Sequence, residues 1–261
     1  MDEGPEGWTS TCRAKIARAD EHLATLYRET DAWGEGDPFK IIRSCHRDGR
    51  VHVFHLRYTA QPDVWRWAVV LGDALHNLRG ALDHLVYALA VQQTGQDPPD
   101  DDASLMFPIC SDRAQWDRTW RRRVGSLNEP TRAAIERVQP YNRLEPEQWF
   151  MPLWWLGQLN AIDKHRMPHL TVLAAHPDEI TIDAEEGTFK ALWNREALSD
   201  GAALLQLVLQ TPNPDLYVDL KATGAVVLQL LDYPPIGLHP TMQDIRREVV
   251  LVCRYLSQFG R

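Results

Sequence analysis

The spacing of apolar positions predicts one long, buried helix over residues 64–94. Leucines recur there at steps of three and four, which places them on a single helix face. They are Leu71, Leu75, Leu78, Leu82, Leu85 and Leu89. Pro62-Asp63 opens the helix and Gly95 ends it.

Five further segments have a helical pattern, namely residues 11–31, 112–123, 129–138, 146–166 and 242–258. Thr241 is expected to cap the last of these helices. Pro168 disfavours a helical backbone at the residue before it, so the helix over 146–166 is expected to end there.

Alternating apolar and polar residues predict strands elsewhere. Residues 39–46 and 51–59 form a hairpin around the turn Asp48-Gly49. Short apolar or alternating segments separated by turn residues predict an antiparallel meander at 169–175, 179–184, 188–193, 203–210, 216–222 and 225–232.

These elements predict an α+β fold, a helical bundle with an N-terminal β-hairpin and an antiparallel β section inserted before the C-terminal helix. The expected division is a bundle over 1–167 that includes the hairpin 39–59, a β section over 168–233, and a helix within 234–261 that packs back on the bundle. Whether the β section is a separate domain stays open, because its strands can also pair with the hairpin.

Composition narrows the class of protein. The start of the chain is acidic rather than basic and apolar, and no run approaches about 18 apolar residues, so neither a signal peptide nor a membrane span is expected. Four scattered cysteines, with no pair at metal-binding or redox spacing, favour reduced thiols in a cytoplasmic protein. The net charge of −8 argues against extensive nucleic-acid binding but leaves room for a local basic patch.

Such a patch surrounds Trp116 and Trp120, where Arg121 and Arg122 lie in an arginine-rich segment. Arginines between aromatic residues suit stacking on bases and contact with phosphate, which makes this segment a candidate RNA-binding surface. The alternative is a solvated helix whose two tryptophans pack inward at a spacing of i, i+4.

The long helix carries the main candidate site. Away from the leucine face, one strip of polar residues contains His76, Arg79 and Asp83, and a second contains Asp73, Asn77 and His84. Asp and Asn are unfavourable inside helices, so this combination favours a functional site. A structural role is the alternative, with Arg79 and Asp83 pairing across one turn.

Gly80 lies between the two strips. Glycine inside a helix costs roughly 1 kcal/mol relative to alanine, so a helix or a ligand is expected to approach the backbone there.

A second candidate cluster lies at the end of the helix over 146–166. Asn160, Asp163 and Lys164 share one strip, whereas His165 points about 160° away from Asp163 on an ideal helix. These residues can complete a site on the facing helix, or the basic ones can simply complement the helix dipole.

The chain resembles a family of uncharacterised bacterial proteins over roughly residues 60–170. The resemblance rests on GDALHNLRGALDH at 72–84, FPI at 107–109, QPY at 139–141 and DKHR at 163–166. It implies no known activity.

The chain also resembles the HEPN-type ribonucleases, which are helical bundles with an Arg-x4-6-His motif and commonly act as dimers. Arg79 and His84 fit that spacing, although Gly80 follows the arginine where those enzymes commonly have a polar residue. The resemblance implies metal-independent RNA cleavage, in RNA processing or defence. Because the two side chains diverge by about 140° around an ideal helix, they need a kink at Gly80, a long reach of the arginine, or a homodimer to converge. His84 would carry the proton, Arg79 would stabilise phosphate charge, and Asn77 would orient the phosphate.

Two other functions remain open. A hydrolase could bind a divalent metal through His76 and Asp83, or Asp73 and His84, with a third ligand from Asp163 or His165. No other cofactor is expected. Alternatively, the polar residues form a buried network in a protein that binds a partner or ligand without catalysis.

Overall fold

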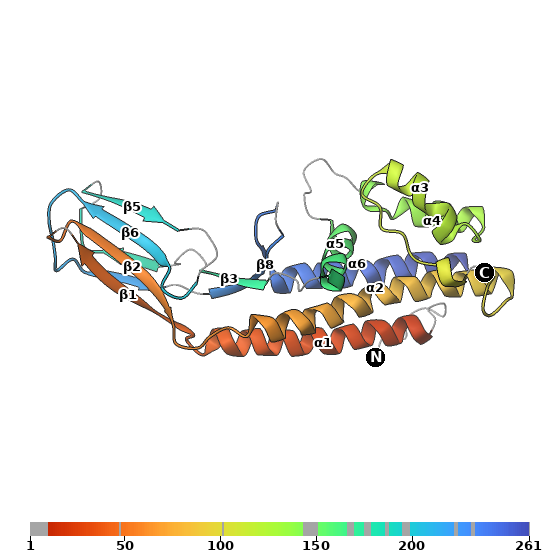
Figure 1. Ribbon diagram of the computed structural model, residues 1–261, viewed down its shortest axis with the longest axis horizontal. Helices are drawn as coiled ribbons and strands as arrows, with labels where there is room; N and C mark the ends of the chain where they lie inside the picture. Colours follow the sequence, from red (N-terminus) through yellow and green to blue (C-terminus); the bar gives the residue numbers. More distant parts are fainter. Residues whose placement is uncertain are drawn as a thin grey trace. The chain divides into compact units, whose positions relative to one another are not determined.

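The computed structural model describes residues 10–46, 48–100, 102–142, 151–165, 170–174, 179–185, 188–194, 199–221, 224–230 and 233–260. The chain divides into two compact units (Figure 1). The helical unit combines Met1–Leu26, Ala68–Pro168 and His239–Arg261. The strand unit combines Tyr27–Trp67 and His169–Leu238.

The described helices are α1 (Ser10–Glu35), α2 (Val64–Thr94), α3 (Arg113–Val124), α4 (Glu129–Arg137), α5 (Pro152–His165) and α6 (Leu238–Leu256). Short 3-10 turns cover Asp102–Ser104, Pro140–Asn142 and Ser257–Phe259. The bounds of α2 are those expected from its leucine pattern and its flanking proline and glycine. The expected start of α5 at residue 146 lies outside the described residues.

Helix α6 begins earlier than its sequence pattern predicted. Its first residue is Leu238, so Thr241 lies inside the helix, and the prediction that Thr241 caps it was wrong. Pro240 falls in the first turn, where a missing backbone N–H leaves no hydrogen bond unmade, so proline does not delay the start.

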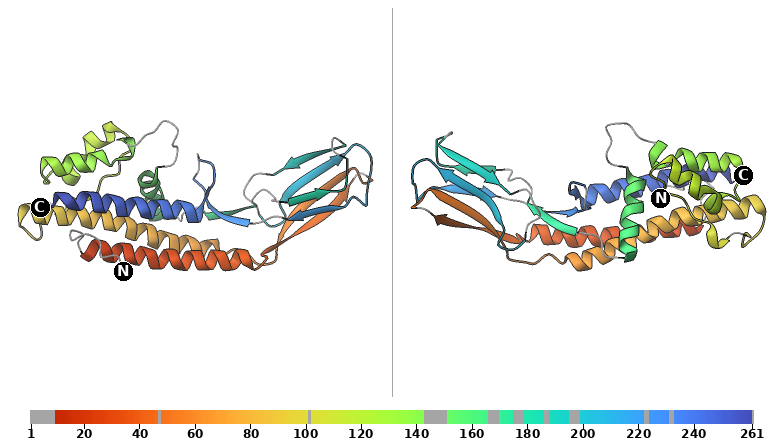
Figure 2. Two further views of the ribbon diagram at one scale, coloured as in Figure 1. Left: turned by 180° about the vertical axis from the view of Figure 1, so that it is seen from behind. Right: turned by 45° about the horizontal axis from the view of Figure 1, so that its top comes forward.

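The leucine face of α2 forms the core of the helical unit. All six leucines of the stripe are at most 2% exposed. Helices α1, α2 and α6 run side by side, and α5 crosses α2 (Figures 1 and 2). None of the helices in the described ranges has the length and apolar character needed to cross a bilayer.

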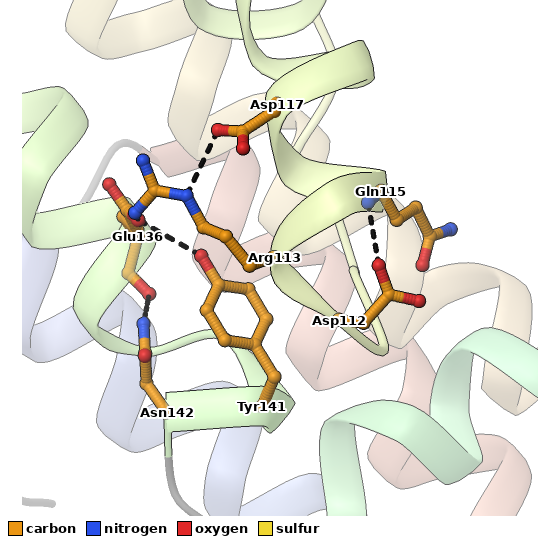
Figure 3. A network of polar contacts seen from close by, with 7 residues as sticks. All are labelled: Asp112, Arg113, Gln115, Asp117, Glu136, Tyr141 and Asn142. Atoms are coloured by element: carbon orange, nitrogen blue, oxygen red, sulfur yellow. Dashed lines mark hydrogen bonds and ion pairs between the residues drawn. The ribbon is translucent and has the colours of Figure 1, made fainter.

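A polar network joins α3, α4 and the 3-10 turn after α4 (Figure 3). Arg113 pairs with Asp117 at 2.9 Å and with Glu136. The Tyr141 hydroxyl donates to Glu136 at 3.0 Å. Burial and this hydrogen bond to a carboxylate raise the pKa of Tyr141 to about 12. The network therefore fixes the segment 139–141 against α3 and α4.

The described strands are β1 (Phe39–His46), β2 (Val51–Tyr58), β3 (Leu170–Ala174), β4 (Glu179–Ile182), β5 (Phe189–Trp193), β6 (Ala203–Leu209), β7 (Val218–Lys221), β8 (Gly224–Leu228) and β9 (Ile236–Gly237). All pairs are antiparallel, and the sheets have the orders β1-β2-β6-β5, β3-β8-β9 and β4-β7.

The expected meander was wrong, because the pairs are nested: β5 pairs with β6, β4 with β7, and β3 with β8. A meander would pair each strand with the next, whereas here the innermost hairpin is enclosed by two outer pairs. The strand positions themselves agree with the sequence pattern.

The N-terminal hairpin belongs to the strand unit. Its strand β2 pairs with β6, so the strands of the β section do pair with the hairpin, a possibility that the sequence left open. Asp48 and Gly49 have φ values of 54° and 90°, the left-handed conformation of a tight hairpin turn. The α+β fold, with a hairpin before the bundle helices and strands before the last helix, is confirmed.

Candidate functional site

Arg79 and Asp83 of α2 hold the extended segment 105–110 through its backbone. Arg79 donates from Nη2 to the carbonyl oxygen of Phe107 and pairs with Asp83 Oδ1 at 3.0 Å. The same Asp83 oxygen accepts the backbone N–H of Phe107 at 2.9 Å. The two side chains are only 12% and 27% exposed. The pair therefore satisfies both backbone groups of one residue in a loop that lacks secondary structure.

The surroundings of Arg79 do not suit a side chain that must reach a substrate. Burial lowers the pKa of Arg79, Asp83 raises it, and Arg123 lowers it further. Its Nη1 atom is buried and has no hydrogen-bond partner among the described residues. The guanidinium is thus committed to Asp83 and Phe107.

The segment 105–110 is held from two further sides. Gln139 is fully buried, accepts the backbone N–H of Cys110 at 2.9 Å, and donates to the carbonyl of Ile135 at 3.0 Å. On α5, a Cβ at Gly157 would come within 3.2 Å of the Ile109 side chain, so this close packing favours glycine. The FPI segment thus contacts α2 and α5 and is bound by the first residue of QPY.

Asp163 of α5 packs against the backbone of α2 at Gly72. A Cβ at Gly72 would lie 2.3 Å from Asp163 Oδ1, so the carboxylate occupies space that only glycine leaves open. Burial and the charge of Asp73 raise the pKa of Asp163, and His76 lowers it. His22 Nδ1 lies 4.0 Å from Asp73 Oδ2. The sequence suggested that Asp163 completes one of the two polar strips of α2, but Asp73 and His76, which act on it, come from different strips. Gly72 and His22 were not anticipated.

At Gly80 a neighbouring helix does approach, as expected, but the contact with α1 is ordinary packing that does not require glycine. A Cβ at Gly80 would meet Lys15 at 3.5 Å, an ordinary van der Waals distance. Lys15 Nζ donates to Asn77 Oδ1 at 3.4 Å, and Asn77 Nδ2 donates to the carbonyl of Asp73 at 2.8 Å. Asn77 is thus buried and hydrogen-bonded within α1 and α2.

The remaining residues of the second cluster are less informative. Asn160 is buried on α5. The side chains of Lys164 and His165 lie outside the described residues.

A pocket of 670 Å³ lies over the second half of α2, and we name it the Tyr87 pocket. Residues that line it include Asp83, His84, Tyr87, Val91, Asp97 and Leu105. His84 lines this pocket and Arg79 does not, in keeping with their divergence around the helix. The nuclease residues therefore do not converge within this pocket.

The polar side of the Tyr87 pocket is acidic. The Tyr87 hydroxyl donates to Asp97 Oδ1 at 2.7 Å. This hydrogen bond, burial, and the charges of Asp97 and Asp102 raise the pKa of Tyr87. Sequence reasoning missed Tyr87 and Asp97, although His84, Tyr87 and Val91 recur at i, i+3, i+7, the spacing of one helix face.

The arginines of α3 lie at the protein surface. Arg121 and Arg122 are exposed, and Trp116 is buried. The guanidinium carbons of Arg121 and Arg132 lie 5.5 Å and 5.3 Å from the ring centroid of Trp120. Stacking of arginine on this ring is present within the protein itself.

Metal ligation is not supported by the described side chains, since no three or more His, Cys, Asp or Glu residues among them are grouped to hold an ion. The chain matches no protein-family model, no curated protein and no solved structure. The resemblances noted from the sequence therefore stay predictions.

Proposed function

We propose that the protein binds a small organic cation with an apolar body in the Tyr87 pocket. The observation that supports this is one cavity lined by the Asp97 carboxylate, the Tyr87 ring and apolar residues. Its volume of 670 Å³ falls in the range of about 300–1,000 Å³ that small-molecule sites occupy.

The charges around the pocket favour a cation. Asp97 and Asp102 both act on the Tyr87 hydroxyl, and neither is paired with a basic residue in any ion pair of the described residues. The third carboxylate, Asp83, is largely offset by Arg79. The Tyr87 ring adds a surface on which an ammonium group can rest. Val91 and Leu105 supply the apolar wall.

A matched set of probes tests the charge preference. Phenethylamine, phenethyl alcohol and 3-phenylpropionate have similar shapes and carry positive, neutral and negative groups. Isothermal titration at pH 7 should show the amine binding at least tenfold more tightly than the alcohol, with no binding of the carboxylate. Equal affinity for amine and alcohol, or no binding of the amine, rejects the proposal.

Variants then locate the binding. Asp97→Asn should weaken amine binding about tenfold, corresponding to about 1.4 kcal/mol. Asp100→Asn is the matched control, because Asp100 is an exposed residue of the same loop that does not line the pocket. An equal effect of both substitutions would indicate only general screening of an acidic loop.

RNA cleavage is a second proposal, favoured by the position of His84 in a pocket rather than in the core. His84 would remove the proton from a ribose 2′-hydroxyl, which then attacks the adjacent phosphorus as the 5′-oxygen leaves. Since Arg79 is committed to Asp83 and Phe107, the phosphate would need another cation, including one from a second copy in a homodimer. The local carboxylates disfavour a polyanion, which is why the cation is proposed first.

Incubation of total RNA with wild type, His84→Ala and His76→Ala tests the second proposal. Cleavage should be lost in His84→Ala and retained in His76→Ala, whose exposed imidazole lies outside the pocket lining. Melting temperatures of all variants separate loss of chemistry from loss of folding. No cleavage by wild type, or cleavage that survives His84→Ala, rejects this proposal.

A further inference from the structure

Two buried cysteines from opposite ends of the chain meet in the helical unit. Cys12 lies in the first turn of α1 and Cys253 in the last turn of α6, 241 residues further along the chain. Their Sγ atoms are 3.6 Å apart, and both residues have no exposed surface. Helices α1 and α6 are both long elements of the bundle (Figure 2). No short cysteine spacing signals this pair, so the fold alone brings the two thiols together.

The two thiols differ in chemical character. Cys12 Sγ is also 3.1 Å from the carbonyl oxygen of Ala81, to which it donates. The hydrogen bond with Cys253 lowers the pKa of Cys12 despite its burial. The pKa of Cys253 is raised by the same contact and by its burial. Of the two sulfur atoms, Cys12 is therefore the one suited to react first and Cys253 the one suited to react second.

We propose that Cys12 and Cys253 form a reversible disulfide when the protein meets a peroxide. Cys12 loses its proton, and its thiolate attacks one peroxide oxygen. The O–O bond breaks, the departing hydroxide takes up that proton and leaves as water, and the Cys12 sulfur becomes a sulfenic acid. The Cys253 thiol then attacks that sulfur and forms the S–S bond, while the S–O bond breaks and the departing hydroxide takes the Cys253 proton and leaves as water. Overall, two thiols and one hydrogen peroxide give one disulfide and two waters, so the sulfur atoms are oxidised and the peroxide is reduced.

The two sulfur atoms have only a short distance to close. A disulfide bond is about 2.05 Å long, so the two sulfur atoms must approach by about 1.5 Å. Thr11, the neighbour of Cys12, lines the Tyr87 pocket. A molecule as small as a peroxide can thus reach a position one residue from Cys12, and opening of the first turn of α1 completes the path.

The experiment uses the full chain with Cys45→Ser, because Cys45 is exposed and would otherwise give disulfides between molecules. The reduced protein is treated with hydrogen peroxide, denatured, alkylated and mapped by peptide mass. The expected product is a peptide pair containing Cys12 and Cys253 joined by a disulfide, while Cys110 is alkylated. Treatment with dithiothreitol before alkylation should restore the two thiols of Cys12 and Cys253.

Two further variants test the order of the steps. Cys253→Ser should leave Cys12 as a sulfenic acid that dimedone traps, and Cys12→Ser should give far less trapping at Cys253. The melting temperature of the oxidised protein should rise by about 5 °C or more, because the bond closes a very long loop. The proposal is overturned if peroxide leaves both thiols free for alkylation, if the bridge contains Cys110, or if dimedone labels Cys253 rather than Cys12.

Discussion

Replacing Asp83 with alanine should strongly destabilise the helical unit. The substitution removes the carboxylate that Arg79 faces at 3.0 Å and the acceptor of the Phe107 N–H at 2.9 Å. Breaking a fully buried ion pair costs about 3–5 kcal/mol. Since Asp83 keeps 27% exposure, water partly replaces it, and a loss of about 2–3 kcal/mol is expected. That loss corresponds to a melting temperature lower by about 5–10 °C.

A double-mutant cycle isolates the pair itself. Arg79→Met keeps the apolar stem and removes the charge, and should also destabilise. The double variant Arg79→Met, Asp83→Ala should lose at least about 1 kcal/mol less than the sum of the single losses, because no unpaired charge remains. Thermal unfolding followed by circular dichroism at 222 nm measures all four proteins.

Asp73→Ala is the matched control, since that side chain lies on the same helix and is 58% exposed. It should change stability by less than about 0.5 kcal/mol. A melting temperature of Asp83→Ala within 1 °C of wild type, or strict additivity in the cycle, would refute the argument that this pair fixes the segment 105–110.

Further predictions concern the contact between α5 and α2, the hydrogen bond from the Cys110 backbone to Gln139, and the exposed thiol of Cys45. Gly72→Ala should gain up to about 1 kcal/mol of stability when Asp163 is also replaced by alanine. It should gain less in wild type, because the new Cβ displaces the Asp163 carboxylate. Equal gains in thermal melts would show that Gly72 and Asp163 are not in contact. Because the pKa of Asp163 is raised in the folded state, ionisation of this carboxyl costs stability as pH rises through that pKa. Asp163→Asn should therefore be more stable than wild type at pH 7, by at most about 1 kcal/mol, and should lose this advantage below pH 3.8. An advantage that persists in acid would contradict the electrostatic cause. Gln139→Leu should cost about 1–3 kcal/mol in chemical denaturation, since it leaves the buried N–H of Cys110 without an acceptor, and a neutral effect would mean that another acceptor replaces it. In the folded protein at pH 8, Ellman's reagent should modify Cys45 rapidly and the other three cysteines only after unfolding, because those three are buried and burial raises the pKa of Cys110 to about 11; rapid reaction of two or more thiols would contradict this.

Elements with a clear repeat could be located from the sequence alone. The bounds of α2 follow from leucines at helical spacing between a proline and a glycine, and β1 and β2 follow from alternation around Asp48-Gly49. Local patterns determine these elements because each repeat reports directly on one buried face.

Strand pairing could not be predicted in the same way. The strands β3, β4, β7 and β8 have only four or five residues each, too few to specify a partner by their pattern. Their nesting is set by contacts between strands that are distant in sequence, as is the pairing of β2 with β6. The close meeting of Cys12 with Cys253 is hidden for the same reason.

The candidate site could be predicted in part. The position of Asp163 near the polar side of α2 follows from polar residues on two facing helices, although Asp73 and His76 come from both polar strips rather than from one. The pairing of Arg79 with Asp83, the structural alternative that the sequence offered, is present at 3.0 Å. The contact of both side chains with the backbone of Phe107 could not be predicted, because an irregular segment leaves no periodic pattern in the sequence.

Because polar side chains can serve the backbone of a neighbouring segment, a high number of polar residues on α2 is an ambiguous signal of catalysis. A helix that is covered by other helices alone can be apolar all round, because its neighbours satisfy their own backbone groups. The segment 105–110 has no regular hydrogen-bonding pattern of its own, so the helix beneath it must supply a donor and an acceptor, and Arg79 with Asp83 does so. A charged pair on a buried helix face therefore indicates an irregular neighbouring segment as readily as it indicates a substrate-binding site. Asp83 and His84 both line the Tyr87 pocket, but Asp83 is already bound to Arg79 and to the backbone of Phe107. His84 is therefore the residue of this helix at which a ligand is to be sought.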